Sequence, residues 1–457
     1  MSTLFKTVLL LTLFALPGAQ GATVPSSQGP MKLSLKQTID LALKQNLDFA
    51  QVKLQLESDT INYNTAWRSF YLPSVNLVAT SASSLTLGAY PGTPSKGYLS
   101  DTRNTGYPSS AIGIAMGNYT LFNFFRDRIA FDIAKLQFER ANQIYEENKR
   151  AFTIGVISSY FQARLSQEKL DASERSLQIA DLILRLVKSR MALKLSDPTE
   201  LDSAEVDRND AVLQVTDLKR EFQNSLLNLN LLLNQNVETP LNLTTELEYK
   251  PANLNFEQAF NCFKERSPGI RSAKLSFEQG QGNVEIAEKN RMPLPTVTFS
   301  GLTVAYGNNY GAGSTNYGST NGQIDVQAAI NLTLPIFGPG GLFNQDAVRS
   351  THINLERAEL GVKKTLIEGE VQIRTALGEL KQLQDRLKPL KDSFESSAKL
   401  LDRIVSQMST KKESRLELRD ALKAARNNEI ALLENVFNYT TRRNDFYRLI
   451  GRELEIE

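Results

Sequence analysis

The side chains best placed to do chemistry are acidic residues near two predicted turns between helices. Glu417 and Asp420 stand three residues apart, so a helix would carry both carboxylates on one face. In the earlier turn, Glu200 follows Thr199 and Asp202 lies nearby. Carboxylates repeated around a passage attract cations, whereas charges near a helical turn are usually just solvated. From the residues alone, both interpretations stay open.

Enzymatic chemistry finds little support in the residue types. The 457 residues include one histidine, His352, and one cysteine, Cys262, so no His/Cys metal site is expected. No nucleophile has a paired base, and the Gly-rich stretches lack the lysine of a phosphate-binding loop. We therefore expect no enzymatic activity, no cofactor and no metal. The expected places are a packed core for Cys262 and a helix surface for His352.

Charge and hydropathy argue against a nucleic-acid-binding protein and against a protein with a transmembrane helix. Fifty-two basic and fifty acidic residues give a net charge of +2 without a dense basic run, so nucleic-acid binding is not expected. Residues 1–21 combine a lysine, an apolar run and small residues, which is typical of a secretory signal peptide. No cysteine follows that run, which argues against a lipid anchor. No later stretch approaches ~18 apolar residues, so no transmembrane helix is expected.

The second half of the chain repeats the plan of the first. A shift of 217 positions aligns Ser189–Ala204 with Ser406–Ala421 without a gap, and six of the sixteen pairs are identical. Such self-similarity indicates two copies of one structural unit. We therefore divide the chain into a signal peptide, 1–21, a first repeat, 22–254, and a second repeat, 255–457.

Each repeat is predicted to contain a helix, two strands and a long helical hairpin. The opening helices span 35–70 and 256–291, and each ends near a Leu-Pro step after which hydrophobicity alternates as in a strand. The next strand of the first repeat, 111–121, changes phase and predicts a bulge near Gly117. Loops rich in Gly, Ser, Tyr and Asn, about 85–110 and 306–322, separate the paired strands.

Two very long helices follow the strands, at about 126–194 and 344–409. Apolar residues recur every seven positions, from Val156 to Met191 and from Leu366 to Met408, which indicates coiled coils. Each rod turns at a polar tip and returns as a shorter helix, 199–234 or 414–450. Pro389 is expected to kink the second rod.

The strands match the length and alternation of outer-membrane strands, about 10 to 12 residues with one apolar face. Four such strands viewed alone would also suit two soluble hairpins. Four strands cannot close, and an open edge in hydrocarbon leaves backbone groups unpaired. Two copies would give eight strands and a filled lumen, whereas three would give twelve and leave an aqueous passage. The predicted fold class is therefore an α+β membrane protein with helical hairpins that form a tunnel and a barrel shared between copies.

With these features the chain resembles the TolC family of outer-membrane channel proteins. The resemblance covers essentially the whole mature chain and rests on Leu35–Asn46, Leu72-Pro73-Ser74, Leu334–Phe337 with Gly340-Gly341, and the two tip segments. It implies a homotrimer in the outer membrane of a Gram-negative bacterium, with a twelve-stranded barrel and a periplasmic α-helical tunnel. It also implies an inner-membrane pump that docks through a periplasmic adaptor.

The resemblance further implies a gate at the tips. In the family, acidic residues near the periplasmic tip narrow the closed tunnel and select cations, and Glu417 and Asp420 match that segment. Glu200 matches an acidic residue that the family links to opening. The predicted gate consists of Thr199, Glu200, Asp202, Glu417 and Asp420.

Adaptor contact is expected at the ends of the hairpins. Family members commonly have a glycine in each tip turn, where this chain has Lys194 and Lys411, so these lysines would bind acidic adaptor residues instead. Arg190 matches the tip arginine of the family. The predicted contact set is Arg190, Lys194, Lys411 and Lys412.

Aromatic residues flank the strand ends on the side of the rods. They predict a periplasmic aromatic girdle or, for the phenylalanines, a dry core where helices meet the barrel. The set comprises Trp67, Phe70, Tyr71, Phe122, Phe124, Phe125 and Phe337.

The predicted function is the exit duct of a tripartite efflux pump or a type I secretion system, with passive transport through a gated tip. The alternative is a soluble periplasmic coiled-coil scaffold or adaptor, which would have no physical reason to keep two pairs of membrane-length strands. Nothing in the sequence identifies the exported substrate.

Overall fold

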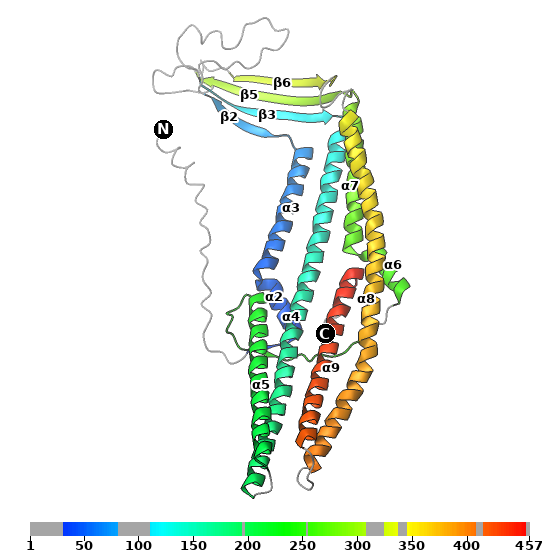
Figure 1. Ribbon diagram of the computed structural model, residues 1–457. Helices are drawn as coiled ribbons and strands as arrows, with labels where there is room; N and C mark the ends of the chain where they lie inside the picture. The colour runs from blue at the N-terminus through cyan, green and yellow to red at the C-terminus, as the bar shows by residue number, and fades with distance from the viewer. Residues whose placement is uncertain are drawn as a thin grey trace.

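The computed structural model describes residues 31–80, 110–193, 197–252, 255–307, 324–336, 345–407 and 415–453. The predicted signal peptide, most of both long loops and the two tip turns lie outside these ranges. The described residues form a tall molecule with a sheet at one end and long helices below it (Figure 1).

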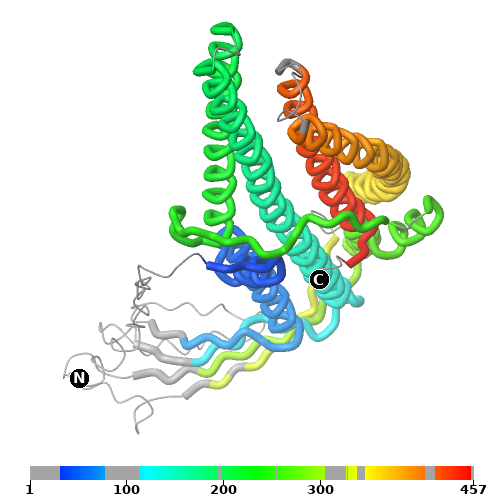
Figure 2. Tube along the Cα trace, turned by 90° about the horizontal axis from the view of Figure 1, so that it is seen from below, coloured from blue at the N-terminus to red at the C-terminus, as the bar shows by residue number. Residues whose placement is uncertain are grey.

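Four antiparallel strands form the sheet. They are β2 (Val75–Thr80), β3 (Ser110–Phe122), β5 (Thr296–Gly307) and β6 (Ile324–Thr333), which pair in the order β2-β3-β5-β6 (Figure 2). The β3–β5 pair joins the two predicted repeats. Within the described part of the chain, β2 and β6 each pair on one side only, so the sheet has two open edges.

Each strand of the sheet connects directly to one long helix, and these four helices form a single layer below the sheet. The chain passes from α3 (Leu47–Tyr71) to β2, from β3 to α4 (Arg126–Ala192), from α7 (Pro268–Arg291) to β5, and from β6 to α8 (Gln345–Gln407). α3 contacts α4, α4 contacts α7, and α7 contacts α8. The helices therefore follow the order of the strands and form one wall (Figure 1). Its two outer helices, α3 and α8, belong to the open edges of the sheet.

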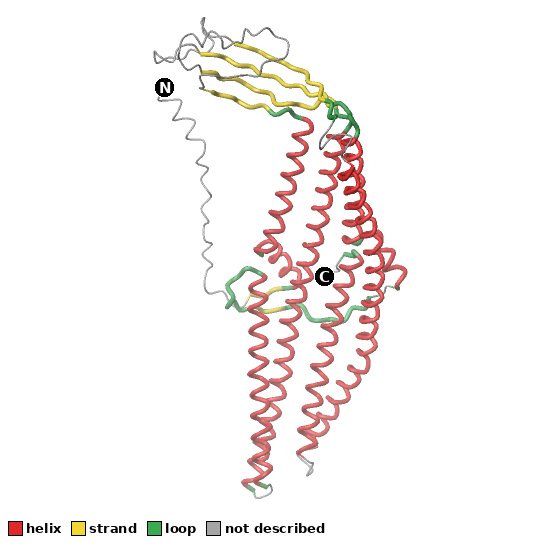
Figure 3. The backbone as a smooth tube through the Cα atoms, turned by 45° about the horizontal axis from the view of Figure 1, so that its top comes forward, coloured by secondary structure: helices red, strands yellow, loops and turns green. Residues whose placement is uncertain are grey.

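Two return helices complete the lower part of this wall. α5 (Pro198–Leu232) runs back along α4, α9 (Arg415–Ile450) runs back along α8, and α4 contacts α9. Figure 3 shows the two hairpins extending away from the sheet. The four predicted long helices are confirmed, with ends within two residues of the expected positions. Among helices in the described ranges, none combines enough length with enough apolar character to cross a membrane.

A segment that we call the strap, residues 233–252, crosses the middle of the wall. It contains β4 (Leu241–Leu243), which pairs in parallel with β1 (Met31–Leu33). The buried Tyr160 hydroxyl on α4 donates to Leu33 O at 3.0 Å and accepts from Thr245 N at 2.9 Å. On the other side, Tyr439 of α9 accepts a hydrogen bond from Ala252 N at 2.8 Å. The strap is thus fastened to both hairpins.

Each of the two predicted opening helices, 35–70 and 256–291, is broken, contrary to the prediction. α2 (Leu35–Gln45) and α3 separate at Asn46, whose side chain accepts from the N–H of Phe49 and caps α3. α6 (Phe256–Arg266) and α7 separate at Ser267, and Pro268 begins α7. A proline fits the first helical position but disfavours helical geometry in the residue before it. A capping side chain at the first break and a proline at the second therefore outweigh the continuous apolar period.

The seven-residue repeats lie at helix interfaces, as predicted. Val156 and Ala163 of α4 and Ile373 of α8 are fully buried. α8 remains one helix through Pro389, and its lower part leans toward α9 in Figure 1. The contacts with α9 hold a helix that has lost one backbone hydrogen bond at the proline.

His352 lies where the sequence places it, whereas Cys262 lies at the edge of a core rather than inside it. Cys262 is partly buried beside the core formed by α6, α8 and α9. His352 is exposed on α8, 3.2 Å from Glu288 of α7. Neither residue belongs to a group of His, Cys, Asp and Glu suited to a metal ion within the described ranges.

Candidate functional site

At the end beside the helices, the second strand pair has one apolar face and one polar face. Phe299 of β5 stands opposite Ile330 of β6, and the next pair along is Thr298 opposite Asn331. Ile330 and Leu332 are 71% and 69% exposed. Side chains one position apart point to opposite faces of a sheet. At this end of the strand pair, an exposed apolar surface thus lies on one side, and hydroxyl and amide groups lie on the other; farther along β5, Leu302 lies on the side of Thr298.

A bulge in β3 keeps its apolar side chains on the same face of the sheet as Phe299 of β5. Met116 of β3 stands opposite Gly301 of β5, yet Tyr119 stands opposite Phe299, so β3 has one extra residue between them. The predicted bulge near Gly117 is confirmed. Because an extra residue shifts the alternation by one, Met116 and Tyr119 both lie on the side of Phe299. The apolar face therefore continues across the β3–β5 boundary.

The predicted aromatic residues form two clusters below the sheet. Phe70 of α3 stacks on Phe131 of α4 with ring centroids 5.2 Å apart, and Phe122 lies 4.8 Å from Phe124. The more exposed members are Trp67 at 43%, Tyr71 at 50%, Phe122 at 44% and Phe125 at 63%. Phe70 and Phe124 are half-buried, and Phe337 lies outside the described residues. The exposed members suit a girdle, whereas Phe70 and Phe124 suit the dry core that was its alternative.

Arg126 and Lys289 tie the turn between β3 and α4 to α7 and β5. The Arg126 guanidinium donates to Asn290 Oδ1 at 3.1 Å and to Thr296 Oγ1. Lys289 Nζ donates to Phe124 O at 3.1 Å. Phe124 has a φ of 55°, a left-handed conformation that costs energy for a bulky residue. These contacts hold the strained turn in place.

At the second tip, the predicted acidic pair is exposed at the start of α9. Leu418 and Ala421 are buried against α8, whereas Glu417 and Asp420 are exposed. The two carboxylates therefore lie on the side of α9 that is turned away from α8. Arg419 Nε lies 3.2 Å from Asp420 Oδ1. This exposed ion pair offsets part of the negative charge.

At the first tip, the acidic residues also serve the helix itself. Asp197 caps α5 by accepting from the N–H of Thr199 at 3.2 Å, and Pro198 begins the helix. Glu200 and Asp202 are exposed in the turns that follow. Carboxylates there complement the helix dipole, so their presence has a structural reason independent of any gate.

The residues predicted to contact an adaptor are described only in part. Arg190 lies in the last turn of α4 and is half-buried. Lys194, Lys411 and Lys412 lie outside the described residues.

Ion pairs between α4 and α9 were missed by the sequence analysis. Lys169 Nζ lies 2.7 Å from Glu434 Oε1, and Arg175 Nη2 lies 2.6 Å from Glu429 Oε1. These pairs join the two hairpins of the chain. No sequence signal could have found them, because the partners are more than 250 positions apart and meet only through helix packing.

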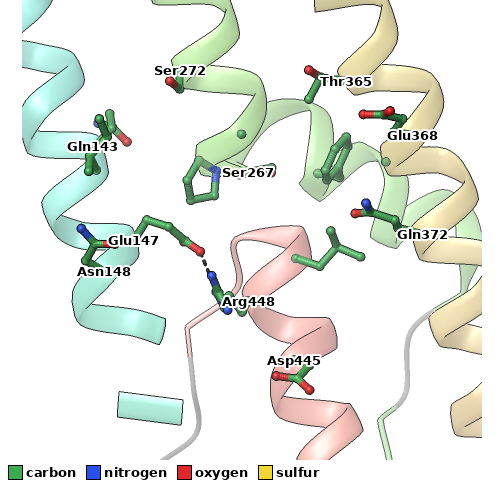
Figure 4. A pocket seen from close by; sticks show the side chains of 16 residues that line it. Gln143, Glu147, Asn148, Ser267, Ser272, Thr365, Glu368, Gln372, Asp445 and Arg448 are labelled. Atoms are coloured by element: carbon green, nitrogen blue, oxygen red, sulfur yellow. Dashed lines mark hydrogen bonds and ion pairs between the residues drawn. The ribbon is translucent and has the colours of Figure 1, made fainter. Parts of the chain in front are cut away.

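A cavity of about 540 Å³ lies where α7 begins and α9 ends (Figure 4). Glu147 of α4 and Arg448 of α9 form an ion pair across it, with Oε1 and Nε 2.6 Å apart. Glu368 and Asp445 also line the cavity. Partial burial raises the pKa of the Asp445 carboxyl, against the opposing effect of Arg442 and Arg448. The cavity between these helices is therefore rich in carboxylates.

A protein-family model described as "Outer membrane efflux protein" matches residues 38–235 and 261–452. The two matched segments fall in the two predicted repeats, one in each. No curated protein matches the chain.

Solved outer-membrane channels share the fold. The CmeC channel of Campylobacter jejuni is 18% identical with a TM-score of 0.70, covering 91% of this chain and 85% of that one. VceC of Vibrio cholerae is 16% identical with a TM-score of 0.70, covering 92% and 97%. The open state of the MtrE channel of Neisseria gonorrhoeae is 19% identical with a TM-score of 0.67, covering 92% and 89%. At these identities, the likeness establishes the fold.

Proposed function

The chain belongs to the outer membrane efflux protein family, and from this premise we propose that it is a homotrimeric exit duct. In this proposal, three copies share a twelve-stranded barrel, and their helices form a tunnel that ends in an acidic gate. The observation that carries the proposal is the wall of four strands and four helices with two open edges.

Family membership confirms the resemblance to TolC and the predicted location. The protein is an outer-membrane efflux protein of the Gram-negative type, with its helices on the periplasmic side. Its family is one of transport ducts rather than enzymes. The alternative of a soluble periplasmic scaffold loses its support, since that class has no use for an uncovered apolar sheet face.

The open edges support assembly from several copies. Unpaired strand edges in hydrocarbon cost several kcal/mol for each unsatisfied backbone group, and β2 and β6 have such edges in the described part of the chain. Pairing β6 of one copy with β2 of the next satisfies both. Closed rotational symmetry repeats this contact until the ring closes, and twelve strands leave room for a passage.

Two kinds of evidence support an internal duplication. The same order of elements, two helices, two strands and two long helices, occurs twice. The two matched family segments also divide between the repeats. In this proposal the chain consists of a signal peptide, 1–21, a first repeat, 22–254, and a second repeat, 255–457.

The acidic tip is the proposed gate. Glu417 and Asp420 are exposed on α9, and threefold repetition would turn each residue into a ring of carboxylates that favours cations. Thr199, Glu200 and Asp202 are proposed to belong to the same gate. The energy for transport would come from an inner-membrane pump reached through a periplasmic adaptor at Arg190, Lys194, Lys411 and Lys412.

Planar bilayers test the duct and the gate together. The purified protein should give stepwise, cation-selective currents, and a protein that inserts without any current would refute the duct. Replacing Glu417 and Asp420 with alanine should raise the single-channel conductance and weaken cation selectivity. Glu356→Ala, an exposed carboxylate high on α8, serves as the matched control. Traces that match the parent protein after the double substitution would remove the gate assignment.

A further inference from the structure

The cavity at the joint between α7 and α9 is large enough for a small organic molecule. Its volume of about 540 Å³ lies within the range of ligand sites in proteins. α4 forms one side and α8 the other, with the start of α7 above and the end of α9 below (Figure 4). All of the lining residues belong to one chain, so each copy contains the complete cavity.

Short side chains at this joint leave the space open. Gly269 and Ser272 of α7 line the cavity. At the same distance from its first residue, α3 of the first repeat carries Asp48 and Gln51 instead. A Cβ added at Gly269 would meet its nearest neighbours at 3.8 Å, an ordinary contact distance. The second joint thus has room that longer side chains would take up.

The lining of the cavity carries more negative than positive charge. Its charged residues are the carboxylates Glu147, Glu368 and Asp445 and the guanidinium of Arg448. Arg448 pairs with Glu147, and Lys364, which lies outside the lining, is 3.7 Å from Glu368. When both pairs are counted, the lining keeps one carboxylate in excess.

Two features indicate that these carboxylates lack full compensation. Glu147 Oε2 is buried, and no hydrogen-bond donor among the described residues reaches it. Burial raises the pKa of the Asp445 carboxyl, although Arg442 and Arg448 oppose the shift. A positive charge in the cavity would stabilise the ionised form of both carboxylates.

The rest of the lining favours an organic ligand over a metal ion. Phe263 of α6, which is 3% exposed, lines the cavity together with Ile144 of α4 and Leu449 of α9. Apolar side chains beside a few charged groups are typical of sites for small organic molecules. Within the described ranges, no group of His, Cys, Asp and Glu is arranged to hold a metal ion.

An anion is the opposite choice, and the charge balance disfavours it. Arg448 and the positive end of the α7 dipole would both attract an anion. Three carboxylates line the same space and would repel it. The single guanidinium is also already paired with Glu147, at 2.6 Å between Nε and Oε1.

We propose that this cavity binds an amphiphilic organic cation. The charged nitrogen lies on the side of Glu147, and the apolar part of the molecule lies against Phe263 and Leu449. This site belongs to the wall of the molecule and is separate from the acidic tip that is proposed as the gate. It is complete in one chain and does not depend on the proposed duct.

Binding of ethidium, an aromatic organic cation, tests the proposal on the full-length protein in a nonionic detergent. Fluorescence polarisation, corrected for empty micelles, should show saturable binding with one ethidium per chain. Benzyltrimethylammonium should displace the dye, whereas benzenesulfonate, an anion of similar size, should not. Displacement by benzenesulfonate alone, or the absence of saturable binding, would overturn the proposal.

Three variants place the dye within the molecule. Glu147→Gln should weaken ethidium binding about fivefold, the upper range for one partly exposed charge pair. Ser272→Phe fills the cavity, keeps every charge and should abolish binding. Glu356→Gln, at an exposed carboxylate higher on α8, is the matched control and should bind ethidium like the parent protein.

Thermal melts show whether each variant folds, and a variant that does not fold leaves the decision to the other. Equal ethidium affinity in the parent protein and in the folded Glu147→Gln or Ser272→Phe variants would place the dye elsewhere and overturn the site. The duct is judged separately, by the currents in planar bilayers. Loss of the cavity site with unchanged currents would therefore leave the duct intact.

Discussion

Removing the Tyr160 hydroxyl should loosen the strap at one defined place. This hydroxyl accepts from Thr245 N at 2.9 Å and donates to Leu33 O at 3.0 Å. In Tyr160→Phe, Leu33 O still accepts from Thr244 N at 3.1 Å. The Thr245 N–H, in contrast, loses this acceptor in a partly buried site.

The size of the effect follows from that one amide. A buried donor left without its partner costs about 1–3 kcal/mol, and partial access to water at the strap puts the loss near the lower end, at about 1–2 kcal/mol. Local opening becomes easier by this amount. Because 1.36 kcal/mol corresponds to a factor of ten, hydrogen exchange at Thr245 should become about five to thirty times faster.

Hydrogen exchange measured by mass spectrometry on the detergent-solubilised protein provides the assay. The matched control is Tyr439→Phe, which removes the acceptor of Ala252 N at 2.8 Å on the other side of the strap. Each variant should speed exchange at its own end of the strap. Unchanged exchange at Thr245 in Tyr160→Phe, or equal effects of both variants at both ends, would refute the reasoning.

Two further predictions concern the helices of the wall. Gly369→Ala should destabilise the protein by about 1–3 kcal/mol through overpacking, because a Cβ there would overlap the Phe263 ring. The control Gly361→Ala meets nothing within 4 Å and should be neutral or slightly stabilising. Thermal melts that rank the two variants equally would contradict this packing. Burial raises the pKa of Glu168, with Arg164 opposing the shift. The folded state then binds the proton more tightly than the unfolded state, so stability should fall as the pH rises from about 4.5 through the raised pKa. Glu168→Gln should lose this dependence, and melting midpoints between pH 4 and 8 that change alike in both proteins would exclude it.

Hydrophobic periodicity predicted most of the fold. The long helices end within two residues of the expected positions, because a period of seven is repeated many times along each of them. The bulge near Gly117 followed from a change of phase, which is also a local signal. The breaks at Asn46 and Ser267 were missed although the capping Asn46 and the helix-starting Pro268 are in the sequence. The apolar period continues across both breaks and conceals them.

The acidic tip was predictable only as a local pattern. The spacing of Glu417 and Asp420 placed them on one side of a helix, and the structure shows that this side is exposed. The pairing of Arg419 with Asp420 joins neighbours in sequence, whereas that of Glu147 with Arg448 spans 301 positions. Contacts between residues far apart in sequence depend on how the helices pack. No local sequence pattern contains that information.

By itself, the sequence determined which segments are helices and strands, and which of their sides are apolar. Only the tertiary structure decided which apolar sides are covered. Phe49 and Leu54 both belong to α3, yet Phe49 is 2% exposed against α4, while Leu54 is 63% exposed. The physical reason is that burial depends on the surface opposite a side chain, and that surface comes from another part of the chain or from another copy.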